Sequence, residues 1–271
     1  LLKSRSALST DGIAVPPPGR YRALLLNAFR SLNGRAATPE MQEALLDAIV
    51  DEATVDRLIL SDPRFICLNR LVVQGPQIWP MVERQSMALR ALWPTHEVEF
   101  FIAMRNPATL IPALFKGSRF ADFREFTENM QPLALAWSEM VRRLRTTHRD
   151  AHIVLWCNED TPLIWGDILR EMAGVASMTP MAGQDDLLQD IMEPSGISRM
   201  QEFLASHPPA SDEQRRRIVA AFLERYARDD VLEEALDLPG WSTELVEQMT
   251  EIYEDDIDLI ASMDNVTLLL P

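Results

Sequence analysis

Three short polar stretches each follow an apolar run, at places where side chains could bind a ligand or move a proton. They are Arg105-Asn106-Pro107, Asn158-Glu159-Asp160 and Ser61-Asp62. An arginine beside the start of a helix offers a bidentate fork next to free backbone amides, and both favour phosphate or sulfate. A carboxylate can serve as a general base where its surroundings suit its pKa. The residue types therefore indicate an anion site with carboxylates nearby.

The apolar runs in front of these stretches are typical of buried strands. Each is short and rich in β-forming residues: 57–61, 97–104 and 152–157. Long segments with apolar residues at helical spacing separate them, which predicts an α/β fold with a parallel sheet covered by helices. Ligands bind beyond the carboxyl ends of such strands, so the three polar stretches are expected at one edge of the sheet.

Helices are indicated by capping residues and by apolar residues three and four apart. We expect helices over 24–32, 85–93, 132–146 and 242–262, helices that begin at Thr38-Pro39, Thr161-Pro162, Ser198 and Ser211, and a final strand over 266–270. The run Pro16-Pro17-Pro18-Gly19 predicts a loop or extended crossing over 11–20. The expected organisation is an α/β core over 1–193 and a helical C-terminal extension over 194–271 that packs on the same domain.

Composition excludes several classes of protein. With 47% hydrophobic and 25% charged residues the chain is a folded globular protein, and no apolar run is long enough to cross a bilayer. The net charge of −15 argues against nucleic-acid binding. Cys67 and Cys157 are too few for a disulfide framework or a metal knuckle, so we expect no metal site and a cytoplasmic location. Residues 229–271 hold 13 acidic residues and no Lys or Arg, which indicates a solvated helix face rather than an interaction surface.

Each candidate residue also has a purely structural interpretation. Arg105 could pair with Asp62 or Asp160 and tie strands together. Asp62, which precedes Pro63, could cap a turn. Glu159 and Asp160 are expected to bind backbone amides at the following helix start. The arginines near 142–149 are expected to form a solvated helix end, favoured by the helix dipole, rather than a patch for acidic substrates.

The segment Phe100 to Pro107 resembles the strand and Arg-(Asn/Asp)-Pro turn of the sulfotransferases, whose arginine binds the 3′-phosphate of the sulfate donor PAPS. The segment Ile153 to Asp160, followed by a helix and Gly174, resembles a later strand and turn of that family. The order and spacing of both motifs agree, over about 58–174. The resemblance, to bacterial members, implies a P-loop-like fold, donor binding by Arg105 and Asn106, and sulfuryl transfer to a hydroxyl of a carbohydrate or small molecule, with PAP as product. It also implies Asp62 as the candidate base, because some members place a catalytic histidine after the corresponding strand.

The sequence departs from the family pattern at two places. Ala113 stands where the family has a serine that also contacts the 3′-phosphate. The lysine-containing loop that cradles the 5′-phosphosulfate is not found among the ten glycines, and its expected place is before Leu1. These departures leave an alternative open, in which the chain is a catalytically inactive nucleotide- or carbohydrate-binding or interaction protein of the same fold.

Overall fold

The computed structural model describes residues 1–52, 54–228 and 238–271, and it is a mixed α/β structure built on a short parallel sheet. The sheet has the order β5 (Glu99–Met104), β6 (His152–Cys157) and β7 (Val266–Leu269), and both neighbouring pairs are parallel. The strand β6 lies in the middle and is buried along most of its length. The parallel sheet expected from the sequence is confirmed.

Two further strand pairs lie outside this sheet. The strands β1 (Ile13–Ala14) and β2 (Arg57–Leu58) form a parallel pair, and β3 (Val73–Gln74) and β4 (Gln77–Ile78) form an antiparallel hairpin. An ion pair between Arg57 and Glu99 joins the starts of β2 and β5. The strand expected over 57–61 is shorter than predicted and consists of the two residues of β2.

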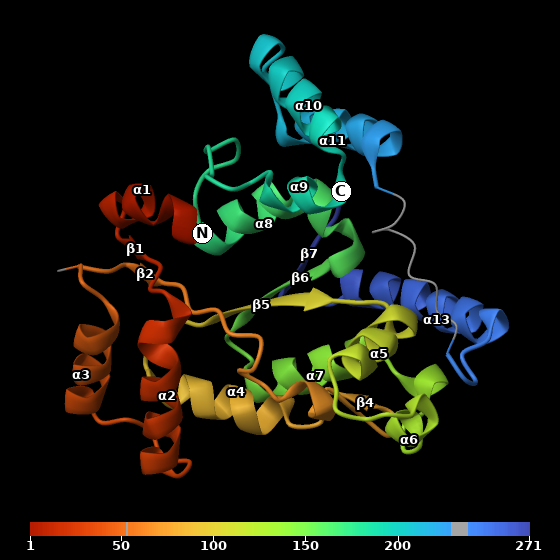
Figure 1. The fold of residues 1–271 in the computed structure, drawn as a ribbon. Coiled ribbons are helices and arrows are strands. Elements are labelled where there is room, and N and C mark those ends of the chain that lie inside the picture. The colour runs from red at the N-terminus through yellow and green to blue at the C-terminus, as the bar shows by residue number, and fades with distance from the viewer. Residues whose placement is uncertain (53, 229–237) are drawn as a thin grey trace.

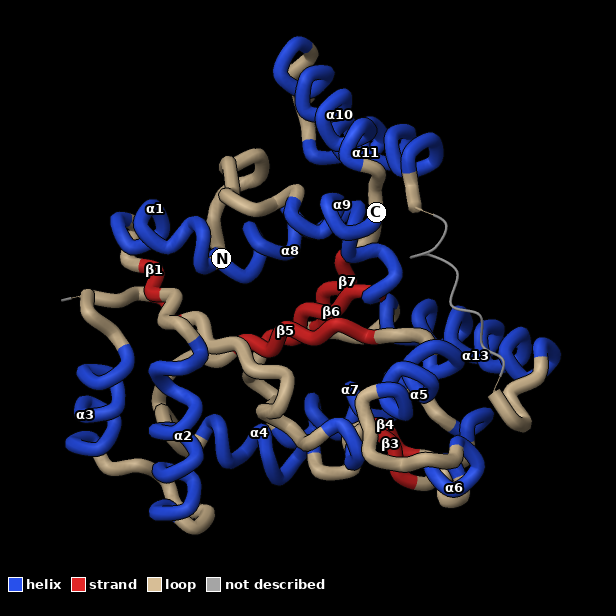
Figure 2. The backbone as a smooth tube through the Cα atoms, in the orientation of Figure 1, coloured by secondary structure: helices blue, strands red, loops and turns tan. Residues whose placement is uncertain are grey.

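Helices cover both faces of the sheet, with α8 on one side and α4 and α7 on the other (Figure 1). The first helices are η1 (Leu2–Ser4), α1 (Arg5–Thr10), α2 (Pro18–Leu32), α3 (Pro39–Ile49), η2 (Asn69–Leu71) and α4 (Val82–Arg90). The middle ones are α5 (Pro107–Lys116), α6 (Phe123–Thr127), η3 (Pro132–Ala134), α7 (Trp137–Thr147), η4 (Asn158–Asp160) and α8 (Thr161–Ala173). The last are α9 (Asp186–Ile191), α10 (Pro194–Ser206), α11 (Asp212–Tyr226) and α13 (Thr243–Ala261). The red segments of Figure 2 show how little of the backbone belongs to strands.

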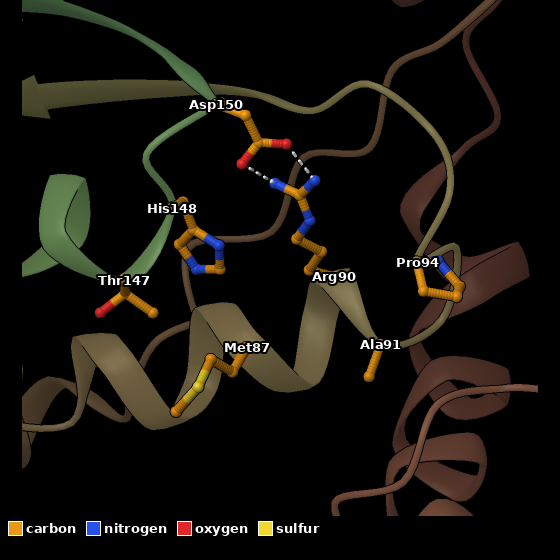
Figure 3. A pocket seen from close by; sticks show the side chains of 7 residues that line it. All are labelled: Met87, Arg90, Ala91, Pro94, Thr147, His148 and Asp150. Atoms are coloured by element: carbon orange, nitrogen blue, oxygen red, sulfur yellow. Dashed lines mark hydrogen bonds and ion pairs between the residues drawn. The ribbon is translucent and has the colours of Figure 1, made fainter.

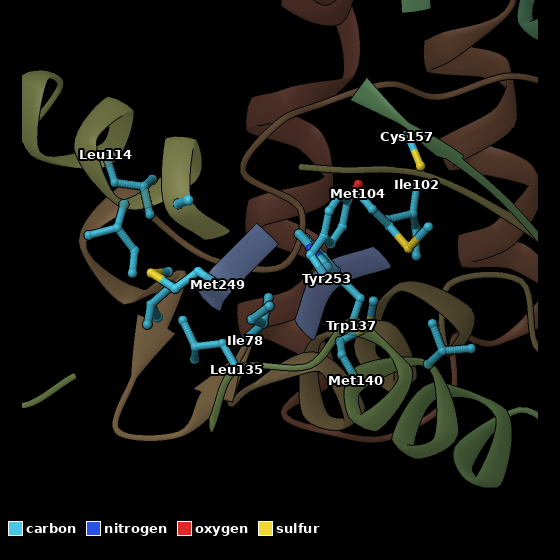
Figure 4. Packing of buried hydrophobic residues seen from close by; sticks show 14 of the residues in the cluster. Ile78, Ile102, Met104, Leu114, Leu135, Trp137, Met140, Cys157, Met249 and Tyr253 are labelled. Carbon is cyan, nitrogen blue, oxygen red and sulfur yellow. The ribbon is translucent and has the colours of Figure 1, made fainter. Parts of the chain in front are cut away.

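Alternation along the strands sends side chains to two separate apolar clusters. Ile102 and Leu155 face the larger cluster, which α5, α7 and α13 complete (Figure 4). Phe101 and Trp156 face the smaller one, where Ile164 of α8 packs against them. The sheet is thus covered on both sides, as parallel sheets require.

Several helix boundaries confirm the capping signals. Thr38 Oγ1 accepts from the Met41 N–H at 3.4 Å, and Ser211 Oγ accepts from the Gln214 N–H at 3.1 Å. Gly174 ends α8 with φ +68°, a left-handed conformation that favours glycine.

Other boundaries differ from the expectation. The loop predicted over 11–20 ends early, because Pro18 takes the first position of α2. At that position the backbone N–H has no partner within the helix, so a proline loses no hydrogen bond. The helix expected to begin at Ser198 begins at Pro194, and the Ser198 hydroxyl donates back to the Pro194 carbonyl oxygen. The helix expected over 132–146 is divided into η3 and α7.

The residues after 193 contribute both to the sheet and to a helical pair that packs on α8 and α9. The helices α10 and α11 pack together, while α13 packs on α5 and α7 and leads into β7. Most acidic residues of α13 are exposed, as expected for a solvated face, although Asp256 is buried. The first part of the predicted acidic segment, 229–237, lies outside the described residues. Of the helices in the described ranges, none has the length and apolar character needed to cross a membrane.

Candidate functional site

The two motifs that follow β5 and β6 meet at the carboxyl edge of the sheet. The backbone N–H of Asn106 donates to Glu159 Oε1 at 2.9 Å, although the two residues are 53 positions apart. Parallel pairing of Met104 with Cys157 sets both motifs at the same level. Of the three polar stretches expected at this edge, these two meet, whereas Ser61-Asp62 follows β2, which is not a strand of this sheet.

Asn106 caps α5 and links it to α13. Its Oδ1 accepts from the Ala108 N–H at 2.9 Å, which satisfies one of the free amides at the helix start. Its Nδ2 donates to Thr250 Oγ1 at 2.9 Å. The side chain of Asn106 is therefore fixed by two elements, and its position depends on α13.

Arg105 lies between the end of β5 and the start of α5. Its Nε donates to Thr109 Oγ1 at 2.9 Å, and its carbonyl oxygen accepts from Trp137 Nε1 at 2.9 Å. The first contact orients the side chain along the first turn of α5, and the second fixes the backbone. The guanidinium thus lies beside the first turn of α5, where the sequence predicted an anion site.

Carboxylates and a buried phenol complete this edge. Tyr253 of α13 donates from its hydroxyl to Glu159 Oε2 at 3.3 Å. Burial raises the pKa of Tyr253, and the neighbouring Cys157 and Glu159 raise it further, so the phenol remains protonated and acts as a donor. Burial also raises the pKa of Asp160, with a second contribution from Glu159. Glu159 was expected to bind an amide at the start of the following helix, but it accepts instead from the Asn106 N–H, and Asp160 makes no side-chain capping hydrogen bond to α8.

Asp62 lies after β2, the second strand of the β1–β2 pair, and its side chain binds two neighbouring residues. Its carboxylate is 7% exposed, forms an ion pair with Arg22, and accepts from the Arg64 N–H at 2.9 Å. The second contact is the turn cap that the sequence offered as the structural interpretation of Asp62. The role of Asp62 as a base stays a prediction.

Two pockets lie at the opposite, amino-terminal edge of the sheet, and neither is lined by Asp62, Arg105 or Asn106. The first, of about 410 Å³, is lined by Met87, Arg90, Ala91, Pro94, Thr147, His148 and Asp150 (Figure 3). Arg90 binds Asp150, and His148 Nε2 lies 2.8 Å from Ser86 Oγ. Burial lowers the pKa of His148, and Arg90 lowers it further. The polar groups of this pocket already have partners, so it offers little chemistry.

Sequence reasoning missed the contributions of Thr250 and Tyr253 to the carboxyl edge. Both come from α13, which is distant in sequence and carries no motif. Within the described ranges, no three His, Cys, Asp or Glu side chains group as they would to hold a metal ion.

Comparison of the chain with protein-family models, with curated proteins and with solved structures gives no match.

Proposed function

We propose that the protein is a sulfotransferase-like enzyme of P-loop-like fold that moves a sulfuryl group from PAPS to a hydroxyl of a carbohydrate or small molecule. The hydrogen bond between the Asn106 N–H and Glu159 carries the proposal, because it joins the two motifs on which the family resemblance rests. Arg105 and Asn106 would hold the 3′-phosphate of the donor at the start of α5. The two free cysteines support a reducing compartment, as in the cytoplasm.

The reaction would make one S–O bond and break another. The acceptor oxygen attacks the sulfur of PAPS, the bond from sulfur to the bridging phosphate oxygen breaks, and PAP leaves. A base must remove the hydroxyl proton, and Asp62 is the residue that we assign to this step. Positioning and charge neutralisation supply most of the catalysis in transfers of this kind.

A second candidate function is donor or carbohydrate binding without transfer. Two observations favour it: the ion pair of Asp62 with Arg22, and the apolar Ala113 on α5 in place of the family's serine. The ion pair engages the carboxylate that transfer would need as a base, and Ala113 departs from the family pattern while Arg105 is kept.

Binding of PAP tests both candidates. We expect PAP to raise the melting temperature of the full chain, and Arg105→Ala to abolish the rise. The contact of Arg105 with Trp137 uses the backbone carbonyl, so the substitution leaves that contact in place. Arg217→Ala is the matched control, because Arg217 is exposed on α11 and pairs with Glu213.

Transfer of labelled sulfuryl from PAPS to a mixture of sugars and small alcohols then separates the candidates. Labelled product that depends on Arg105 supports the enzyme. Binding of PAP without product supports the binding protein. A shift that Arg105→Ala leaves unchanged, or no shift at all, contradicts the assignment of Arg105 to a donor site in either candidate.

A further inference from the structure

The second pocket at the amino edge of the sheet gathers positive charge. It has a volume of about 490 Å³ and is lined by Arg142, Arg145, Thr146, His148, Arg149 and Asn265. The arginines come from the last turns of α7 and the segment after it, and Asn265 stands just before β7. Three arginine residues therefore line one hollow in a chain whose net charge is −15.

These arginines differ from their neighbour Arg143. Arg143 donates to Glu139 Oε1 at 2.8 Å and to Glu83 Oε2 at 2.9 Å, and it also binds two backbone carbonyls. In the described part of the chain, no carboxylate lies within 4.0 Å of the charged groups of Arg142, Arg145 and Arg149. The guanidinium of Arg142 donates to Ser138 Oγ at 3.4 Å. One side of α7 is thus neutralised, and the side that faces the pocket is not.

The nearest acid in sequence does not neutralise the pocket, because it is already engaged. Both oxygens of Asp150 bind Arg90, on the side of the first pocket, as the dashed lines in Figure 3 show. The end of α7 is also held in place: Thr146 Oγ1 donates to the Arg142 carbonyl at 2.8 Å, and Thr147 Oγ1 donates to that of Arg143 at 2.9 Å. These hydrogen bonds support the last turns of α7, which carry Arg142 and Arg145.

Like charges brought together without acids favour an anion with several acceptor oxygens. A guanidinium binds phosphate or sulfate through two parallel N–H donors, and such charge-assisted hydrogen bonds are about twice as strong as neutral ones. Asn265 adds a polar side chain at the rim, held by a 2.8 Å hydrogen bond from its Nδ2 to the Ala151 carbonyl.

We infer that this pocket, formed by Arg142, Arg145 and Arg149, binds a tetrahedral oxyanion, either a phosphate or sulfate ion or the monoester of one on a larger molecule. The site is distinct from the proposed donor site, because β6 separates them. At about 3.3 Å per residue, the six-residue strand places the two edges about 17 Å apart. A group bound here is too far away to be the transferred sulfuryl, so the pocket anchors a ligand and takes no part in transfer.

Titration of the full chain with inorganic phosphate, sulfate and methyl phosphate, at ionic strength held constant with chloride, tests the inference. We expect saturable binding by calorimetry, and a loss of about tenfold in affinity for Arg145→Ala and for Arg149→Ala. Arg217→Ala, on exposed α11, is the control and should bind as the parent does. Tighter binding of methyl phosphate than of free phosphate would identify an esterified ligand, and the reverse order a free ion.

Arg105→Ala separates this inference from the proposed function. It should abolish the effect of PAP and leave phosphate binding unchanged, whereas Arg145→Ala combined with Arg149→Ala should do the opposite. Phosphate effects that equal those of chloride, or that survive the double substitution, would overturn the inference. Circular dichroism of each variant shows whether it is folded.

Discussion

The carboxylate of Asp256 accepts a hydrogen bond from the backbone N–H of Ser138 at 3.0 Å, across 118 residues of sequence. Ser138 stands in the first turn of α7, and the residue at the cap position, Ala136, has no side chain that could accept from these amides. Asp256 lies on α13 and is 7% exposed. One helix thus supplies the missing cap of another, and the negative charge lies at the positive end of the α7 dipole.

Asp256→Ala should lower the free energy of unfolding by about 1–2 kcal/mol, because it leaves a buried helix start without its acceptor. Urea denaturation followed by circular dichroism measures the change. Asp258→Ala, at an exposed position on the same helix, should change the stability little. Equal effects of the two substitutions would show that the contact with Ser138 contributes nothing.

Gly196→Ala should destabilise the packing of α10 on α11. A Cβ at Gly196 would lie 2.4 Å from Tyr226 Cβ and 2.7 Å from its Cγ, so the two helices must move apart. Overpacking of this kind costs about 1–3 kcal/mol. Gly19→Ala is the matched control in α2, where nothing lies within 4 Å, and it should stabilise the chain by about 0.5–1 kcal/mol. Thermal denaturation checks whether Gly196→Ala lowers the melting temperature and Gly19→Ala raises it.

Asp160→Asn should make the protein more stable at neutral pH. The pKa of Asp160 is raised above its ordinary value of 3.8 by burial and by Glu159, so the folded state binds this proton more tightly than the unfolded state does. The stability that this proton contributes is complete below pH 3.8 and is lost as the pH rises through the raised pKa. The gain from the asparagine should therefore be present at about pH 7 and absent at about pH 3. Asp190→Asn, at an exposed position in α9, serves as the control.

Arg105→Lys should lose most of the stabilisation by PAP while keeping the positive charge. The lysine ammonium is a point charge, and it cannot offer the planar pair of donors that fits a phosphate. Melting curves with a series of PAP concentrations compare it with Arg105→Ala and the parent. A lysine variant that responds as the parent does would show that charge alone holds the ligand.

The sequence predicted the parts of the fold that local signals determine. β6 was located to the residue because a short apolar run stands between polar ends, and α3 and α8 because Thr38 and Gly174 fix their boundaries. Ser198 misled because a capping-box spacing also occurs inside helices, and Pro194 supplied the stronger start. Signals of this kind determine where a helix begins and ends, but not which helices pack together in the folded chain.

The candidate site was predictable only as far as strands position it. Arg105, Asn106 and Glu159 come together because β5 and β6 are parallel and in register, which the order of the motifs implied. The contacts of Thr250 and Tyr253 depend on where α13 lies, and no residue spacing encodes that. The arginines of α7 were interpreted as a solvated helix end because a sequence shows neither the acids bound to Arg143 nor the hollow beside Arg145.

The pairing of β6 with β7 has a consequence for how the chain reaches its native state. Ile153 pairs with Val266, so the sheet is complete only when two segments separated by more than a hundred residues come together. Contacts of such large sequence separation form slowly, whereas α10 and α11 are neighbours in the chain and can associate early. We expect hydrogen exchange during refolding to protect the amides of that helical pair first and those of β7 last.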